Sequence, residues 1–259
     1  MPSRVLVTGA GGRVGRILGA GLRDLRLTLT DRNELDAYDR DALIRAMADH
    51  DQVIHLALPL RGRRGFWTDE ECAASVRMAK TVLEAGEAAG VRRLLMPSSV
   101  RATSDEQLFG HLPVGVADTR TPETLYGRTR LEIEALARGA SGKTVEVSCV
   151  RLGAIHHPDF PTPDTLARRV WLSHEDCAGL MRACIDAPVV PGRFSVWYAI
   201  SDLPGRILDV SNPFGWRPMT TSVGLRRILA WKVRQINTAI RGRLRLRSRL
   251  KALGQRGTP

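Results

Sequence analysis

Hydrophobic and polar positions follow two alternating patterns along most of this chain. Short runs of consecutive apolar residues predict buried strands, and longer stretches with a helical period predict helices between them. The predicted strands span residues 4–8, 25–30, 52–58, 93–97, 145–152 and 194–199. A predicted helix opens at residue 14, and others span residues 41–48, 70–89, 126–138 and 174–186.

This alternation indicates an α/β protein. Strands that alternate with helices of ten or more residues form βαβ units, whose strands are parallel and covered on both faces. We therefore expect a Rossmann-type, doubly wound parallel sheet over residues 1–221. The order loosens after residue 152, where Pro158, Pro161 and Pro163 mark a loop. A small C-terminal substrate lobe is expected from about residue 153.

The charge of the chain is concentrated at one end. Hydrophobic residues make up 43% and charged residues 25% of the 259 residues, a composition typical of globular proteins. The formal net charge is +12, yet residues 222–259 hold eleven of the 39 Lys and Arg and no Asp or Glu. The first 221 residues thus carry 28 basic against 27 acidic side chains, so the excess says nothing about the substrate of the main domain.

Residues 222–259 are predicted to form a basic, helical C-terminal arm. Apolar residues at positions 225, 228, 229, 233, 236 and 240 make a helical stripe flanked by arginines and lysines. One interpretation is that this stripe docks on the domain, or on a second subunit in a homo-oligomer. The other is that the arm binds an anionic surface, such as a membrane or nucleic acid, or an acidic partner. The sequence leaves both open.

The four cysteines and the N-terminus favour a cytoplasmic protein. No pair of cysteines has the C-x-x-C spacing, and four are too few for a disulfide framework, so we expect reduced, packed thiols. Neither a leader pattern nor an apolar run of membrane-spanning length is present. The basic arm adds peripheral membrane attachment as an open alternative.

A glycine-rich turn lies between the first predicted strand and helix. Gly9 permits a tight turn, Gly12 leaves room for a pyrophosphate, and Gly15 lets the helix approach the strand. The free N–H groups of the helix N-terminus then face the phosphates. Because strand, turn and helix occur in this order, the turn predicts a dinucleotide site. Its contacts are assigned to Gly9, Gly11, Gly12, Arg13, Val14 and Gly15.

An acidic residue after the second predicted strand selects the cofactor. Asp31 lies 22 residues after Gly9, where a carboxylate can accept hydrogen bonds from ribose hydroxyls and repel a 2′-phosphate. We therefore expect NAD, with NADP less favoured. Arg32 and Arg13 are the cations that would hold a 2′-phosphate instead.

A tyrosine and a pair of serines suggest the chemistry. Tyr126 opens a predicted helix, and Ser98 and Ser99 follow the fourth strand. Together with the glycine turn, they make the chain similar to the extended short-chain dehydrogenase/reductase superfamily. Within it, the chain most resembles uronate dehydrogenases of the NAD-dependent epimerase/dehydratase family. The likeness includes residues 55–57, 150–153, 171–176 and 214–218.

The resemblance implies a role for each residue. Tyr126 would exchange the hydroxyl proton while a hydride passes to the nicotinamide, and Ser99 would hydrogen-bond the same oxygen. A tyrosine hydroxyl ionises near pH 10, so it needs a nearby cation to act as a base. The family has a lysine four residues later, and this chain has Arg130. We therefore expect Arg130→Lys to retain or raise the activity. Further cofactor contacts are implied for Leu56, Ala57, Ser98, Tyr126 and Arg130, whose guanidinium can also donate to the ribose hydroxyls.

Several positions depart from the pattern of the uronate enzymes. Val100 and Arg101 replace the usual Asn-His, Ser75 stands where an asparagine is common, and Ala154 where a serine is common. Arg168 and Arg169 lie where the family has an arginine for the uronate carboxylate. Arg101, Arg168 and Arg169 are thus candidate contacts for an anionic substrate, although a solvated helix face explains the last two equally well.

The most favoured function is an NAD-dependent oxidoreductase acting on a hydroxyl or carbonyl of a small sugar or sugar acid. Two alternatives remain. The first is a nucleotide-sugar epimerase or dehydratase, which the short region after the sheet disfavours. The second is a catalytically weakened dinucleotide-binding scaffold or sensor, which Arg130 and the altered pocket favour. No metal is expected, because His156, His157 and His174 have no further ligand at suitable spacing.

Overall fold

A computed structural model describes residues 3–59, 67–142, 144–161 and 165–222. The chain divides into two units, Met1–Thr221 and Ser222–Pro259, and the description below concerns the first. The predicted basic arm lies outside the described residues, apart from Ser222. Within the described ranges, no helix is both long and apolar enough to span a bilayer.

Six parallel strands form the central sheet of the first unit, in the order β2-β1-β3-β4-β5-β6. The chain moves from β1 to β2 in one direction and then returns to place β3 on the other side of β1. The strand order therefore reverses at β1, which is where open α/β sheets bind their ligands. The strands are β1 (Val5–Thr8), β2 (Leu27–Thr30), β3 (Gln52–His55), β4 (Arg93–Ser99), β5 (Glu146–Leu152) and β6 (Phe194–Ala199).

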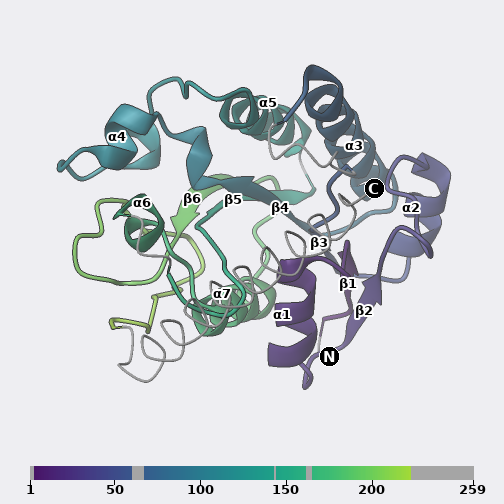
Figure 1. The fold of residues 1–259 in the computed structure, drawn as a ribbon. Helices are drawn as coiled ribbons and strands as arrows, with labels where there is room; N and C mark the ends of the chain where they lie inside the picture. The colour runs from purple at the N-terminus through teal and green to yellow at the C-terminus, as the bar shows by residue number, and fades with distance from the viewer. Residues whose placement is uncertain (1–2, 60–66, 143, 162–164, 223–259) are drawn as a thin grey trace, which may run out of the picture. The chain divides into compact units, whose positions relative to one another are not determined.

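Helices cover both faces of this sheet (Figure 1). The helices α1 (Arg13–Gly21) and α7 (His174–Asp186) pack together on one face. On the other face lie α2 (Arg40–Met47), α3 (Asp69–Ala88) and α5 (Leu125–Ala140).

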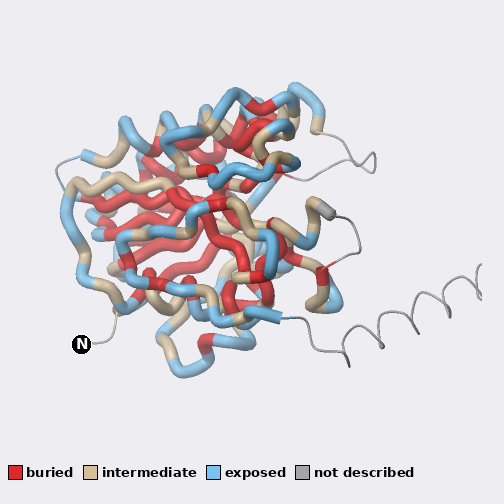
Figure 2. The backbone as a smooth tube through the Cα atoms, turned by 90° about the vertical axis from the view of Figure 1, so that its left-hand side faces the viewer, coloured by how far each residue is buried: buried red, intermediate tan, exposed pale blue. Residues whose placement is uncertain are grey.

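Each face of the sheet has its own apolar core. Alternation along β1 sends Val5 and Val7 into the core beneath α1 and α7, and Leu6 into the core beneath α3 and α5. All three side chains are fully buried. Figure 2 shows the buried strands at the centre and exposed backbone around them. The prediction of a doubly wound parallel α/β fold is confirmed.

A smaller apolar cluster lies beyond the carboxyl end of the sheet. It is formed by segments that follow β4, β5 and β6, and two short helices belong to this region, α4 (Asp105–Phe109) and α6 (Thr165–Arg169). An isolated bridge between Val114 and Leu208 joins two of its segments. Its buried members are Val100, Leu108, Val114, Val170, Tyr198, Ile200 and Leu208.

The predicted elements match the observed ones with four corrections. The predicted strand 25–30 begins too early, since β2 starts at Leu27. The predicted strand 52–58 is too long, since β3 ends at His55 and residues 56–58 turn out of the sheet. The predicted strand 93–97 is too short, because β4 continues through Pro97 to Ser99 and pairs there with β5. Both short helices, α4 and α6, were missed.

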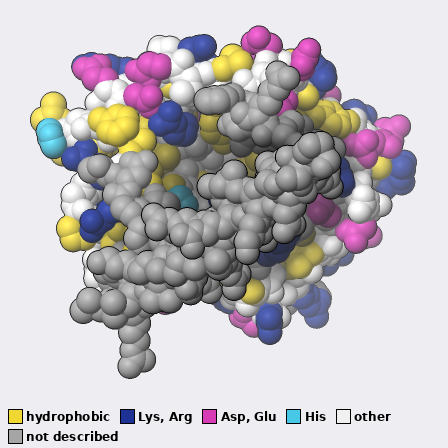
Figure 3. Space-filling model, in the orientation of Figure 1, with side chains coloured by type: hydrophobic (Ala, Val, Ile, Leu, Met, Phe, Trp, Pro, Cys, Tyr) yellow, Lys and Arg dark blue, Asp and Glu magenta, His cyan; other side chains and the backbone are white. Residues whose placement is uncertain are grey.

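Acidic and basic side chains are mixed around the visible surface, as Figure 3 shows.

Candidate functional site

The glycine turn after β1 has the close approaches that its sequence predicts. Gly9 has a positive φ of 69°, and a Cβ there would lie 2.5 Å from the backbone nitrogen of Ala57. A Cβ on Gly15 would collide with the backbone of Ala10, and one on Gly11 with the carboxylate of Asp31. Side chains at these positions would therefore fill the space between the turn and the segments after β2 and β3.

A cavity of about 840 Å³ opens where the strand order reverses, between the turn after β1 and the segment after β3. Its size lies within the range of small-molecule and cofactor sites. It is lined by every residue that the sequence predicted for the cofactor, namely Gly9, Gly11, Gly12, Arg13, Val14, Gly15, Asp31, Arg32, Leu56, Ala57, Ser98, Tyr126 and Arg130. The predicted catalytic residue Ser99 lines it as well. The glycine turn and the volume of this cavity are those expected for a dinucleotide site.

The cavity also has lining residues that the sequence did not indicate. They come from the segments after β2 and β3, from α3, from β4, and from the end of β5 and the segment after it. Their positions follow from the sheet order, which no local sequence pattern reveals. They are Leu35, Asp36, Ala37, Tyr38, Leu58, Pro59, Met78, Pro97, Leu152, Gly153 and Ile155.

Asp31 and two arginines line the cavity from its glycine-rich side. Asp31 is exposed directly after β2, and its Oδ1 accepts a hydrogen bond from the N–H of Arg32. Arg13 is the first residue of α1, and its Nη1 donates to the carbonyl oxygen of Ile155 at 2.5 Å. Because this bond occupies Arg13, Arg32 is the better placed of the two predicted partners for a 2′-phosphate.

Gly127 explains how Tyr126 and Ser99 come to line one cavity. Ser99 ends β4, and Tyr126 is the second residue of α5, whose first turn is capped by the Thr124 side chain. A Cβ on Gly127 would collide with the carbonyl oxygen of Arg101, so a glycine lets α5 pack directly on the turn after Ser99. The Oγ of Ser99 accepts the N–H of Arg101 at 3.2 Å, which leaves its proton available for donation.

Arg130 is a buried cation one helical turn after Tyr126. Arg130 is only 3% exposed, and its Cζ lies 4.8 Å from the centroid of the Tyr126 ring. Nη2 donates to the Ser75 hydroxyl at 2.8 Å, and Nε has no hydrogen-bond partner among the described residues. Burial lowers the pKa of Arg130, and the nearby Tyr126 opposes this shift.

Ser98 faces a charged network beneath the cavity. Its hydroxyl donates to Glu134 at 2.5 Å, and Glu134 also accepts two hydrogen bonds from Arg151, each of 2.8 Å. Arg151 in turn donates to the hydroxyl of Tyr198 at 2.9 Å. Ser98 thus connects the cavity wall to a buried ion pair, a contact that the sequence did not reveal.

His55 is a neutral buried group at the end of β3. Its Nδ1 shares a 2.8 Å hydrogen bond with the Thr8 hydroxyl, which links β3 to β1. Burial, with a smaller contribution from the charge of Arg130, lowers the pKa of His55 to about 4. An imidazole with this pKa carries no charge at neutral pH, so Arg130 is the cation of this part of the site.

The low pKa of His55 predicts a pH-dependent stability. An unfolded histidine binds a proton near pH 6.5, whereas the folded protein does so only near pH 4. Between these values the unfolded chain takes up a proton that the folded chain does not, so the free energy of unfolding should fall as the pH falls. We expect a loss of about 2 kcal/mol between pH 7 and pH 5. Urea denaturation at both pH values measures it.

The matched variant for this measurement is His55→Asn, which keeps a polar partner for Thr8 but does not titrate. Burial also lowers the pKa of His156, but this residue is present in both proteins, so its contribution cancels in the comparison. The variant should therefore lose about 2 kcal/mol less than the wild type over the same pH range. Equal losses in the two proteins would contradict the assignment.

The three arginines predicted for an anionic substrate do not line the cavity. Arg101 forms an ion pair with Asp105, with 2.9 Å between Nη1 and Oδ1. Arg169 donates to the carbonyl oxygens of Phe109 and Gly110, which ties α6 to the end of α4. Arg168 is exposed on α6. Recognition of a substrate anion by these side chains stays a prediction that their contacts do not favour.

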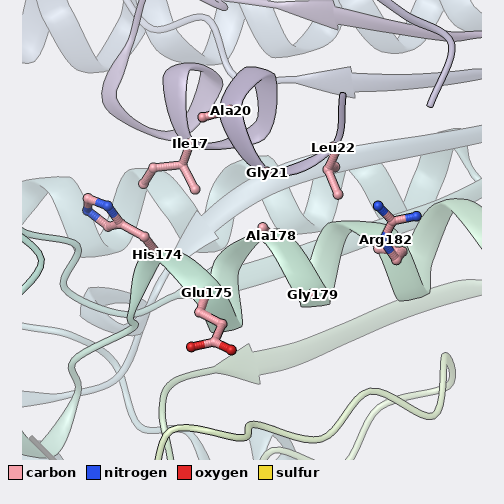
Figure 4. Close-up of a pocket in the computed structure, with 9 residues that line it drawn as sticks. All are labelled: Ile17, Ala20, Gly21, Leu22, His174, Glu175, Ala178, Gly179 and Arg182. Atoms are coloured by element: carbon pink, nitrogen blue, oxygen red, sulfur yellow. The ribbon is translucent and has the colours of Figure 1, made fainter. Parts of the chain in front are cut away.

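A second cavity of about 440 Å³ lies between α1 and α7 (Figure 4). None of the predicted site residues lines it, and its Arg182 is paired with Asp24. The nearby histidines have structural contacts, since His174 Nε2 shares a 2.8 Å hydrogen bond with the carbonyl oxygen of His156. The cavity of about 840 Å³ where the strand order reverses is therefore the candidate active site.

Comparisons with known proteins identify the family of this chain. Residues 5–174 match the model of the NAD dependent epimerase/dehydratase family. An L-arabinose 1-dehydrogenase (NAD(P)(+)) of Haloferax volcanii is 29% identical over 250 residues, which cover 85% of this chain and 98% of the relative. An NAD-dependent glucose-6-phosphate dehydrogenase of the same organism is 27% identical over 233 residues, or 78% of this chain and 86% of the relative.

A solved structure extends the likeness to the fold. The crystal structure of uronate dehydrogenase from Agrobacterium tumefaciens superimposes with a TM-score of 0.73 and 25% identity, and the match covers 88% of each chain. The predicted resemblance to this group is confirmed. Because the family model covers well over half of the 259 residues, the chain belongs to the NAD dependent epimerase/dehydratase family.

Proposed function

We propose that this protein is an NAD-dependent oxidoreductase that oxidises a hydroxyl of a small sugar or sugar acid. The observation that carries the proposal is the meeting of Ser99, Tyr126 and Arg130 in the wall of the cavity that starts at the glycine turn. The predictions of an oxidoreductase and of a nicotinamide cofactor are confirmed at the level of the family and its named dehydrogenases.

The residues divide the reaction between them. When bound, NAD supplies the acceptor for the hydride that leaves the substrate carbon. The Tyr126 oxygen takes the proton of the substrate hydroxyl, and Ser99 donates a hydrogen bond to the same oxygen. Arg130 keeps a positive charge beside the Tyr126 ring, 4.8 Å from its centroid, and so faces the group that would take the proton. The glycine turn and the N-terminus of α1 would hold the pyrophosphate, and Asp31 the adenosine ribose.

The substrate is a small sugar rather than a nucleotide sugar in this proposal. The named relatives act on L-arabinose, on glucose-6-phosphate and on a uronate, so one scaffold serves neutral and anionic sugars. In this chain Arg101 and Arg169 are occupied by Asp105 and by backbone carbonyls. We therefore place neutral aldoses before uronates among the candidate substrates.

An absorbance screen at 340 nm tests the function. NAD and NADP are each offered with neutral aldoses, uronates, sugar phosphates and nucleotide sugars, and reduced cofactor is followed. We expect turnover with NAD and a small sugar. Dependence on a nucleotide sugar would favour an epimerase or dehydratase, and NAD binding without any turnover would favour the scaffold or sensor.

Asp31 should make NAD bind more tightly than NADP, because its carboxylate would repel a 2′-phosphate at close range. Asp31→Ala should lower the ratio of the Kd for NADP to the Kd for NAD by about tenfold or more. Calorimetric titration of both cofactors measures the ratio. Arg32→Ala in the same background should restore part of the preference for NAD, since Arg32 is the cation next to this position. Tighter binding of NADP by the wild type would contradict the prediction.

The roles of the basic arm and the oligomeric state stay predictions. Residues 223–259 lie outside the described part of the chain, so docking of the arm and binding to an anionic surface remain alternatives that rest on its eleven cations.

A further inference from the structure

Trp67 is an aromatic neighbour of the proposed catalytic pair that the sequence did not indicate. Its ring stacks on the Tyr126 ring, with 4.8 Å between the centroids and 29° between the planes. The Cζ of Arg130 lies 5.5 Å from the centroid of the Trp67 ring and 4.8 Å from that of Tyr126. One guanidinium thus contacts two aromatic rings that also contact each other.

The starts of two helices hold this arrangement in place. Trp67 directly precedes Thr68, the N-cap of α3, and reciprocal bonds between Thr68 and Glu71 close the first turn of this helix. Tyr126 lies in the first turn of α5, and α3 packs against α5. Because both helix starts are capped, the backbone on either side of the stacked rings is fixed.

Ser75 completes the contacts of the guanidinium. It lies on α3, is 4% exposed, and accepts the hydrogen bond from Arg130 Nη2. The short side chain of serine leaves space for the wide guanidinium. A longer side chain at position 75 would fill that space. Arg130 thus has a hydroxyl acceptor on α3 and two aromatic rings as neighbours.

We propose that Trp67 and Ser75 are positioning residues that hold the Arg130 guanidinium against Tyr126, so that this site is built for an arginine. The proposal rests on the roles proposed above for Tyr126 and Arg130. A planar guanidinium can lie against aromatic rings and still donate from Nη2, whereas an ammonium is a compact charge on a flexible stem. The proposal therefore reverses the expectation for Arg130→Lys, because one compact ammonium cannot contact both rings and donate to Ser75 at the same time.

A double-mutant cycle on NAD affinity tests the proposal without any substrate. Trp67→Leu is made in the wild type and in the Arg130→Lys variant, and the Kd for NAD is measured by calorimetry. We expect Trp67→Leu to weaken NAD binding about five- to tenfold in the presence of Arg130 and less than about twofold in the presence of lysine. Trp67→Phe, which keeps an aromatic face, should stay within about twofold of the wild type.

Two serine variants provide a matched pair. Ser75→Ala should also weaken binding by about fivefold only when Arg130 is present, since it removes the acceptor of Nη2. Ser195→Ala removes a hydroxyl on β6 that is hydrogen-bonded to Ser148 on β5. This variant should leave the Kd unchanged. Near-UV circular dichroism and thermal unfolding verify that each variant keeps the fold.

Equal losses from Trp67→Leu in both backgrounds would overturn the proposal, and so would equal damage from Trp67→Phe and Trp67→Leu. These outcomes differ from a failure of the proposed function. If the cycle shows coupling but no sugar is oxidised, the positioning role stands and the function is wrong. If a sugar is oxidised but the losses are additive, the function stands and Trp67 only packs.

Discussion

Tyr126→Phe should reduce turnover by about a thousandfold or more and leave NAD binding nearly unchanged. The substitution removes only the hydroxyl oxygen that exchanges the proton. Its phenyl ring can still stack on Trp67, whose centroid lies 4.8 Å away, and can still lie beside Arg130. Initial rates at 340 nm and calorimetric titration with NAD separate the two effects, once the screen has identified a substrate.

Tyr38→Phe is the matched control for this prediction. Tyr38 is a second tyrosine in the lining of the cavity. It follows β2, is 41% exposed and has no role in the proposed proton transfer. Its variant should stay within about twofold of wild-type turnover. If Tyr126→Phe keeps wild-type turnover on the same substrate, another group is the base and the mechanism proposed above is wrong.

The sequence was sufficient to predict the sheet and the glycine turn after β1 because both depend on local patterns. A strand, a glycine turn and a helix are adjacent in the chain, so the contacts of Gly9 and Gly15 follow from neighbouring residues. The end of β3 was not predictable in this way. Residues 56–58 are as apolar as the strand before them, and only the close approach of Ala57 to Gly9 shows that they leave the sheet.

The proposed catalytic residues were indicated by resemblance, but the contacts that surround them depend on tertiary structure. Arg130 and its acceptor Ser75 are 55 positions apart, and Ser98 and Glu134 are 36 positions apart. No periodicity connects such pairs. The same limit affected Arg169, whose position suggested a substrate anion and whose guanidinium binds the carbonyl oxygens of Phe109 and Gly110. Charge alone could not distinguish these two uses of an arginine.

Glu134→Ala should lower the free energy of unfolding by about 3–5 kcal/mol. Glu134 is 7% exposed and its partner Arg151 is 3% exposed, so the variant leaves a cation in the interior without its carboxylate. This cost is a large part of the total stability of a typical domain, which is about 5–15 kcal/mol. Ser98 also loses the acceptor of its hydroxyl, so the wall of the cofactor cavity should be disturbed as well.

Urea denaturation of three variants distinguishes the loss of the ion pair from the loss of a helix side chain. Glu132→Ala, two residues away on the exposed face of α5, should change the free energy of unfolding by less than about 0.5 kcal/mol. Combining Glu134→Leu with Arg151→Met should recover much of the stability, because an apolar pair of similar volume leaves no buried charge. If Glu134→Ala costs no more than Glu132→Ala, the pair contributes little. In that case the rigidity of the cavity wall at Ser98 must come from the β4–β5 pairing alone.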